Sequence, residues 1–101
     1  MTEYDMTEFS ILCQEYLDSS IELRKAAELC EDDPIKQEMV AFIAPDFEDV
    51  QIRSEGIQTF LKNDQYPQYK SFIISEMKSI TKKNLEMARK IREKLSPLVW
   101  N

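Results

Sequence analysis

The chain has 101 residues, of which 43% are hydrophobic and 10% aromatic, enough for one modest core and too few for two domains. One glycine and four prolines indicate long helices with few turns, and no β-branched residues alternate as a strand requires. The sequence therefore predicts a single all-α domain over residues 1–101, and its composition argues against disorder.

The net charge of −6 is unevenly distributed along the chain. Five basic and sixteen acidic residues precede Gln65, whereas eight basic and three acidic residues follow from that point. We expect acidic helices to lie against a basic one and neutralise it within the fold. The alternative is a basic face left free for an anionic partner, against which the net negative charge acts at long range.

The first helix is predicted to begin near Asp5 or Thr7 and to end near Cys30, with Thr7 as a plausible N-cap. Small residues on this helix would allow a neighbouring helix to approach closely. Cys13 and Cys30 lie seventeen residues apart, which is roughly 25 Å on one helix, so they cannot form a disulfide with each other. Free thiols are typical of a reducing compartment, and we expect a cytoplasmic protein. The apolar positions of this helix are Phe9, Leu12, Cys13, Tyr16, Ser20, Leu23, Ala27 and Cys30.

The acidic segment Glu31–Asp33 followed by Pro34 is the clearest turn, because Asp33 suits an N-cap and Pro34 the first helical position. The second helix runs from there to about Leu61. Pro45 lies inside it, and the apolar stripe keeps its phase across the proline, which favours a kinked continuous helix over two separate ones. The single glycine, Gly56, is expected to permit a close helix contact.

Asn63 is expected to take a left-handed conformation in the next turn, and Asp64 or Gln65 opens the final helix. This helix should end at Ser96–Pro97. Leu98–Asn101 then forms a short apolar tail, which either covers the end of the bundle or serves as a docking peptide or subunit contact. Eight of the thirteen basic residues lie in this final helix. Its apolar stripe consists of Tyr69, Phe72, Ile73, Met77, Ile80, Met87, Ile91 and Leu95, interrupted by Asn84.

The predicted fold is an antiparallel three-helix bundle, or four helices if Pro45 breaks the second. No apolar run approaches the length of a membrane span, and no basic-then-apolar leader opens the chain. Asn84 inside the apolar stripe resembles the polar residues that set register in coiled coils, although a capping or water-bonded asparagine is equally compatible.

Chemistry-bearing motifs are scarce. The chain has no histidine, which removes the commonest general base and metal ligand, and it has no Walker loop, dinucleotide fingerprint or CxxC pair. Carboxylates at helical spacing, such as Glu28 with Glu31, would need matching inward carboxylates on a second helix to bind magnesium. We therefore predict neither an enzyme nor a bound metal or cofactor.

Two side chains, Ile74 and Leu85, project from the flank of the final helix and widen its apolar arc. A helix that meets two neighbours in a bundle can bury so wide an arc internally. The alternative, which we predict, is a contact surface with another protein or a second copy, as in an adaptor, immunity protein or inhibitor. The predicted partner-binding residues are Ile74, Leu85, Leu98, Val99 and Trp100. The alternative function is nucleic-acid binding through the basic residues opposite the core stripe, which are Lys78, Lys82, Arg89 and Arg92.

Overall fold

The computed structural model describes the backbone of residues 3–99 and the side chains of residues 7–96. The elements are α1 (Glu3–Glu28), α2 (Pro34–Met39), the 3-10 turn η1 (Ala41–Ile43), α3 (Ala44–Lys62) and α4 (Tyr66–Val99). No strand occurs in this part of the chain. The predicted all-α fold is confirmed, and of the two predicted arrangements the structure has the one with four helices.

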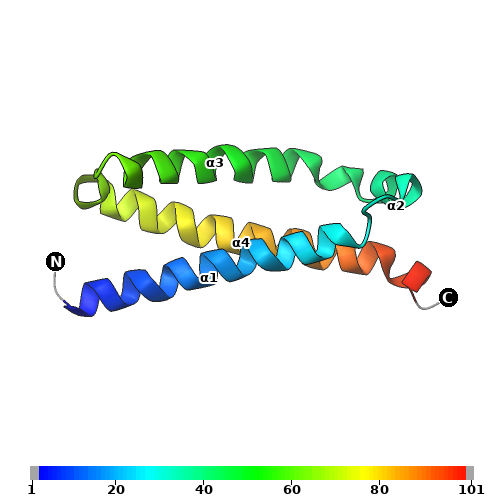
Figure 1. Cartoon of the computed structure of the whole chain (residues 1–101), viewed down its shortest axis with the longest axis horizontal. Helices are drawn as coiled ribbons and strands as arrows, with labels where there is room; N and C mark the ends of the chain where they lie inside the picture. The colour runs from blue at the N-terminus through cyan, green and yellow to red at the C-terminus, as the bar shows by residue number, and fades with distance from the viewer. Residues whose placement is uncertain (1–2, 100–101) are drawn as a thin grey trace.

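The helices form an elongated bundle of 53 × 23 × 18 Å. Consecutive long helices run in opposite directions, so α1 and α4 run in the same direction (Figure 1). The most extensive packing joins these two parallel helices, which are far apart in sequence, and α3 packs on the other side of α4. Because α1 and α3 make hardly any direct contact, α4 is the central element.

The core lies along the inward stripe of α4. Ile73 and Ile80 are completely buried, and Ile91 and Leu95 are nearly so, while α1 contributes small residues such as Ser19 and Ala26. Small side chains let two helix backbones approach closely, and α1, which is also longer than α3, packs more extensively on α4 than α3 does. The buried positions of α4 are Ile73, Met77, Ile80, Asn84, Met87, Ala88, Ile91 and Leu95.

A polar layer interrupts this core between α1 and α4. The Asn84 amide Nδ2 donates to Ser19 Oγ at 3.1 Å and to Ser20 Oγ at 3.4 Å. Both serine hydroxyls in turn donate to the Tyr16 carbonyl oxygen, at 2.7 and 3.2 Å. Asn84 is only 2% exposed, and its Oδ1 finds no hydrogen-bond partner among the described residues. The predicted interruption of the stripe is therefore a buried residue that pairs across the helices.

The turn before α2 forms as predicted. Asp33 Oδ1 accepts hydrogen bonds from the backbone N–H groups of Ile35 and Lys36, at 3.1 and 3.2 Å, and Pro34 opens the helix. Asp32 takes a positive φ of 61° to reverse the chain. The Gln37 side-chain amide then donates to the Cys30 carbonyl oxygen at 3.1 Å, which holds α2 against the end of α1.

The expected continuous helix through Pro45 is wrong. The helix ends at Met39, a 3-10 turn follows, and α3 begins at Ala44 with Pro45 in its first turn. A continuous helix would press the proline ring against the Ala41 carbonyl and lose a backbone hydrogen bond, whereas a first-turn proline sacrifices no bond. Val40, at the break, is buried, whereas Phe42 and Phe47 of the predicted stripe are exposed.

Two smaller expectations are also wrong. The left-handed residue after α3 is Asp64, with φ of 56°, and not Asn63. The Asp64 and Gln65 N–H groups donate to the carbonyls of Leu61 and Phe60, which is the double hydrogen bond of a Schellman motif. Gly56 is exposed, and nothing lies within 4 Å of a Cβ added there, so it supports no close helix contact.

The predicted end of α4 at Ser96–Pro97 is wrong as well, because the helix continues to Val99. The helix therefore continues through Pro97, although the proline cannot donate a backbone hydrogen bond to the Glu93 carbonyl. Residues 98–99 therefore extend α4 and do not fold back as a separate tail. Trp100 and the side chains of Leu98 and Val99 lie outside the described residues.

Candidate protein-interaction face

One side of the α1–α4 pair combines exposed apolar side chains with charges of both signs. A shallow pocket of about 270 Å³ opens between the two helices there. Its apolar lining includes Ile11 of α1 and Ile74 of α4, with Glu15 and Lys78 at its rim. Ile11 is 55% exposed, whereas Ile74 is partly buried against the core. The full lining is Glu8, Phe9, Ile11, Leu12, Glu15, Lys70, Ile74 and Lys78.

Helical spacing extends this surface along both helices. Residues seven apart recur on nearly the same side of a helix, which places Leu85 between Lys78 and Arg92. Glu22 Oε2 and Arg92 Nη1 lie 3.1 Å apart, so these residues join the two helices further along. We call this surface the α1–α4 face and define it by Glu8, Ile11, Glu15, Glu22, Lys70, Ile74, Lys78, Leu85 and Arg92.

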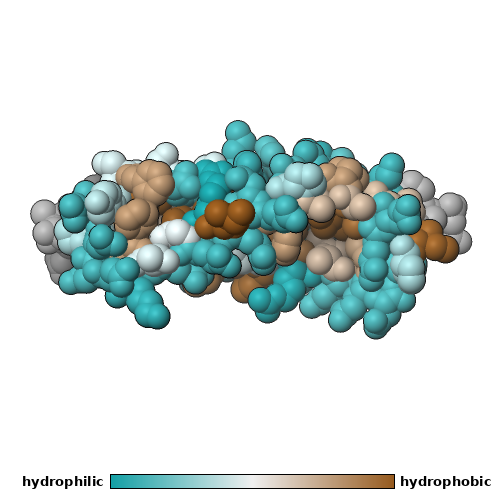
Figure 2. All heavy atoms as spheres, turned by 90° about the horizontal axis from the view of Figure 1, so that it is seen from above, coloured by the Kyte–Doolittle hydropathy of each residue, from teal (hydrophilic) through white to brown (hydrophobic). Residues whose placement is uncertain are grey.

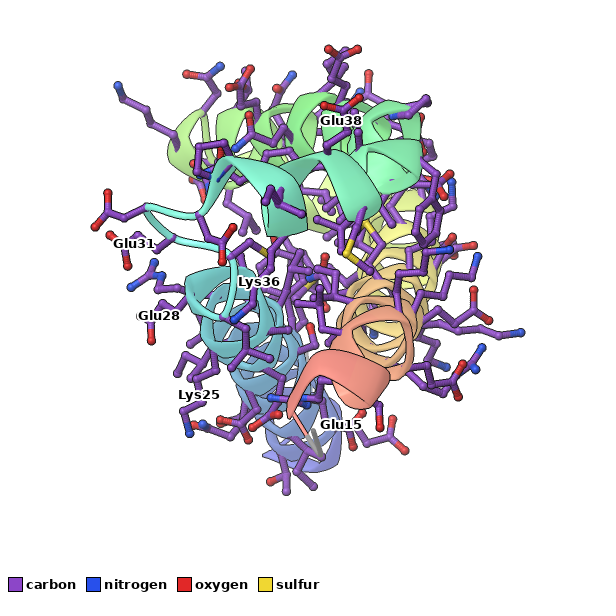
Figure 3. All side chains as sticks on the ribbon, turned by 90° about the vertical axis from the view of Figure 1, so that its right-hand side faces the viewer. Glu15, Lys25, Glu28, Glu31, Lys36 and Glu38 are labelled. Atoms are coloured by element: carbon purple, nitrogen blue, oxygen red, sulfur yellow. The ribbon has the colours of Figure 1, made fainter. Side chains whose placement is uncertain are left out.

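The side chains of the α1–α4 face lie where the two helices adjoin. In the view along the bundle, Glu15 lies on the side of α1 nearest α4, whereas Lys25 and Glu28 project away from it (Figure 3). Leu85 is 48% exposed. It follows Ile74 by eleven residues, or about three helical turns, so the two side chains lie on nearly the same side of α4 and about 16 Å apart along its axis.

Charges on the opposite flank, between α3 and α4, are paired with one another. Arg53 Nε and Nη2 donate to the two carboxylate oxygens of Glu76, each at 2.8 Å. Asp49 accepts from Lys83 at 2.7 Å and from Arg53 at 3.4 Å. The hydrogen bonds from Arg53 lower the pKa of Glu76, and the hydrogen bond from Lys83 lowers the pKa of Asp49. The carboxylates of Glu76 and Asp49 are therefore already bound by cations of the same chain.

On the α1–α4 face, by contrast, only some of the charged side chains are paired with one another. Glu8, Glu15 and Lys78 form no ion pair with any of the described side chains, although opposite charges line the same pocket. Glu22 and Arg92 do pair, at a distance of 3.1 Å. The expectation that acidic helices neutralise the basic one is therefore confirmed in part, because Glu22 pairs with Arg92 and Asp49 pairs with Lys83 of α4.

The alternative basic surface lies partly on the same face. Arg92 pairs with Glu22 of α1, and Arg89 pairs with Glu93 one turn later at 2.9 Å. Lys78 and Lys82 are exposed and form no ion pair within the described part of the chain. These four residues thus do not form an uninterrupted strip of free cations, because carboxylates lie beside two of them.

The α3 side of the molecule presents a different surface. Seen from above Figure 1, this side is mostly hydrophilic, with separate hydrophobic spots (Figure 2). Ile52 is 69% exposed and projects outward from the middle of this helix. Scattered apolar side chains of this kind are normal on a protein surface, and they distinguish the α3 side from the apolar pocket between α1 and α4.

Sequence reasoning missed the contribution of α1 to the candidate face. Ile11 lies off the apolar stripe of its helix, and Glu8, Glu15 and Glu22 recur every seven residues. This seven-residue spacing is visible in the sequence, but it indicates a shared surface with α4 only when the side of α1 that packs against α4 is known. The parallel pairing of these two helices supplies this information.

Both cysteines are free thiols in the described region. Cys30 is buried and Cys13 partly so, and neither is in a disulfide. Burial raises the pKa of both thiols, which disfavours the nucleophilic thiolate. Among residues 3–99, no cluster of three or more potential metal ligands is found, and no helix combines the length and apolar character needed to cross a membrane.

Comparisons of the chain with protein families, with curated proteins and with solved structures found no match.

Proposed function

We propose that this protein is a helical interaction module that binds another protein chain through the α1–α4 face. The observation that carries the proposal is the exposed Ile11 at the pocket next to Ile74, with Leu85 exposed further along the same side of α4. These apolar side chains lie between carboxylates on α1 and cations on α4. Apolar centres with charged rims are typical of protein–protein contacts. The apolar side chains supply binding energy, and the rim charges select the partner and its orientation.

Nucleic acid is the weaker alternative. Glu8, Glu15 and Glu22 lie along the α1 side of this face, where a phosphate backbone following the cations of α4 would meet them. The net charge of −6 repels a polyanion at long range. A protein partner with charges of both signs suits this surface better.

As part of the same proposal, the protein works in a reducing compartment such as the cytoplasm, as an adaptor, immunity protein or inhibitor. The two free cysteines support this placement, because oxidising compartments favour disulfides.

The proposal is tested by site-specific photo-crosslinking in cells. A photoreactive amino acid replaces Leu85 in one variant and Ile52 in a matched control, since both positions carry exposed apolar side chains on different faces. We expect a discrete protein adduct from position 85 and none from position 52. Adducts of equal yield at both positions, no adduct at either, or salt-sensitive binding of duplex DNA would each overturn the proposal.

A further inference from the structure

We propose that the partner of the α1–α4 face is a second copy of this chain. The two copies face each other about a two-fold axis parallel to their helices, so that α1 of each copy lies against α4 of the other. This inference rests on the proposed function, because it names the occupant of the same face.

The first argument is the separation of charge across the face. The α1 side carries Glu8, Glu15 and Glu22, each seven residues after the last. The α4 side carries Lys70, Lys78 and Arg92, with Leu85 between the last two. One side of the face is therefore acidic and the other basic, and the two helices run in the same direction.

Symmetry decides which arrangement suits these charges. In an isologous dimer the same patch meets itself through a two-fold axis. An axis perpendicular to the helices would place α1 on α1 and α4 on α4, so that like charges meet. An axis parallel to the helices places the acidic side of each copy on the basic side of the other. The face is complementary to itself in this second arrangement only.

The register of the charges agrees with this arrangement. Glu15 and Lys78 line the same pocket, so they lie at about the same height along the bundle. A two-fold axis parallel to the helices preserves height, so Glu15 of one copy meets Lys78 of the other. Neither residue has an ion pair with the described residues of its own chain, and both are exposed. Each dimer would contain this contact twice.

The size of the face suits a dimer. Two adjacent helices over about twenty-two residues present a strip of about 30 by 20 Å, or about 600 Å². This lies at the lower end of the roughly 600–1,000 Å² that each partner buries in a standard interface. The chain also exposes 7178 Å², compared with about 6,000 Å² for a compact monomer of this mass. Its Cα radius of gyration of 16.1 Å likewise exceeds the ~13 Å expected for a compact domain of this length. A dimer along the length of α4 would cover part of this excess surface.

The test is a charge-reversal experiment read by sedimentation equilibrium over the micromolar range. We expect the wild type to have twice the chain mass of 11.9 kDa. Glu15→Lys and Lys78→Glu should each weaken the dimer about tenfold or more, because each variant places like charges opposite each other twice. Glu28→Lys is the matched control, since Glu28 projects from α1 away from α4, and it should leave the dimer intact (Figure 3).

Mixing the two weakened variants is the decisive step. In a mixed dimer the new lysine at position 15 meets the new glutamate at position 78, while the other contact is wild type. We therefore expect the one-to-one mixture to dimerise as well as the wild type, with circular dichroism showing that each variant keeps its helices. A dimer whose mixture does not recover would overturn the two-fold arrangement.

A wild type that stays monomeric at every concentration would overturn the inference as a whole. The photo-crosslinking experiment separates this result from failure of the proposed function. If position 85 still gives an adduct whose mass corresponds to a different protein, the face binds a foreign chain and the dimer alone is refuted.

Discussion

Replacing Asn84 with leucine should stabilise the protein, although it removes two hydrogen bonds. The Oδ1 atom is buried with no partner among the described residues, which costs about 1–3 kcal/mol. Leucine matches the branched shape of asparagine and adds about 1.5–3 kcal/mol of apolar burial. The two lost hydrogen bonds, at 3.1 and 3.4 Å, contribute about 0.5–1.5 kcal/mol each. Together these contributions should raise the free energy of unfolding by about 2 kcal/mol.

No buried donor is orphaned by this change. The hydroxyls of Ser19 and Ser20 already donate to the Tyr16 carbonyl oxygen, so they lose only a role as acceptors. Urea and thermal unfolding followed by circular dichroism, at one fixed protein concentration, should show the melting temperature of Asn84→Leu raised by about 10 °C. Thr81→Val provides a second test, because the Thr81 Oγ1 is also buried and has no hydrogen-bond partner within the described part of the chain. If Asn84→Leu lowers stability, the polar layer is satisfied in a way that these contacts do not show, and the reasoning fails.

Three further predictions concern separate features. Gly56→Ala should raise the free energy of unfolding by about 1 kcal/mol, because the site is helical and open; an unchanged or lower value in urea unfolding would contradict this. Asp33→Ala should lower it by about 1 kcal/mol through loss of the N-cap, whereas an effect near zero would show that α2 is held by packing alone. The Arg53 hydrogen bonds lower the pKa of Glu76 from its ordinary value of 4.5. Their contribution to the free energy of unfolding is therefore complete above pH 4.5, and it is lost as the pH falls through the lower pKa of Glu76 in the folded protein. Glu76→Gln should therefore cost about 1 kcal/mol at pH 7 and almost nothing at pH 2, and an equal cost at both pH values would refute the assignment.

The sequence predicted the fold class because the helix signals are strong and local. The Asp33–Pro34 start of α2 appears in the structure as expected, and so does the apolar spacing of α4 from Ile73 to Leu95. Tyr69 and Phe72, at the start of the predicted stripe, are exposed instead. The errors arose where a local rule has two outcomes. Pro45 can kink a helix or stand in the first turn of a new one, and Pro97 can end a helix or lie within its last turn. Backbone geometry beyond the proline decides between these outcomes, and residue type alone does not.

The candidate face was only half predictable for a different reason. Ile74 and Leu85 lie beside the stripe of α4, which a helical wheel shows directly. Ile11 belongs to the same face only because α1 packs parallel to α4, and this choice depends on tertiary packing. A pattern within one helix cannot show which of its sides meets another helix far away in the sequence. The partner-binding role of Ile74 and Leu85 remains a prediction.

The parallel packing of α1 on α4 has a consequence for the order in which the protein folds. The α3–α4 hairpin is closed by a short turn, whereas the contacts of α1 join residues 65 to 70 positions apart, as in Asn84 with Ser19 and Arg92 with Glu22. Closing so long a segment costs more chain entropy than closing the hairpin. During synthesis α1 leaves the ribosome before α4, so its apolar side has no surface to pack on until most of α4 has followed. Although α1 is made before α3 and α4, it is therefore the last of the three to be secured in the bundle.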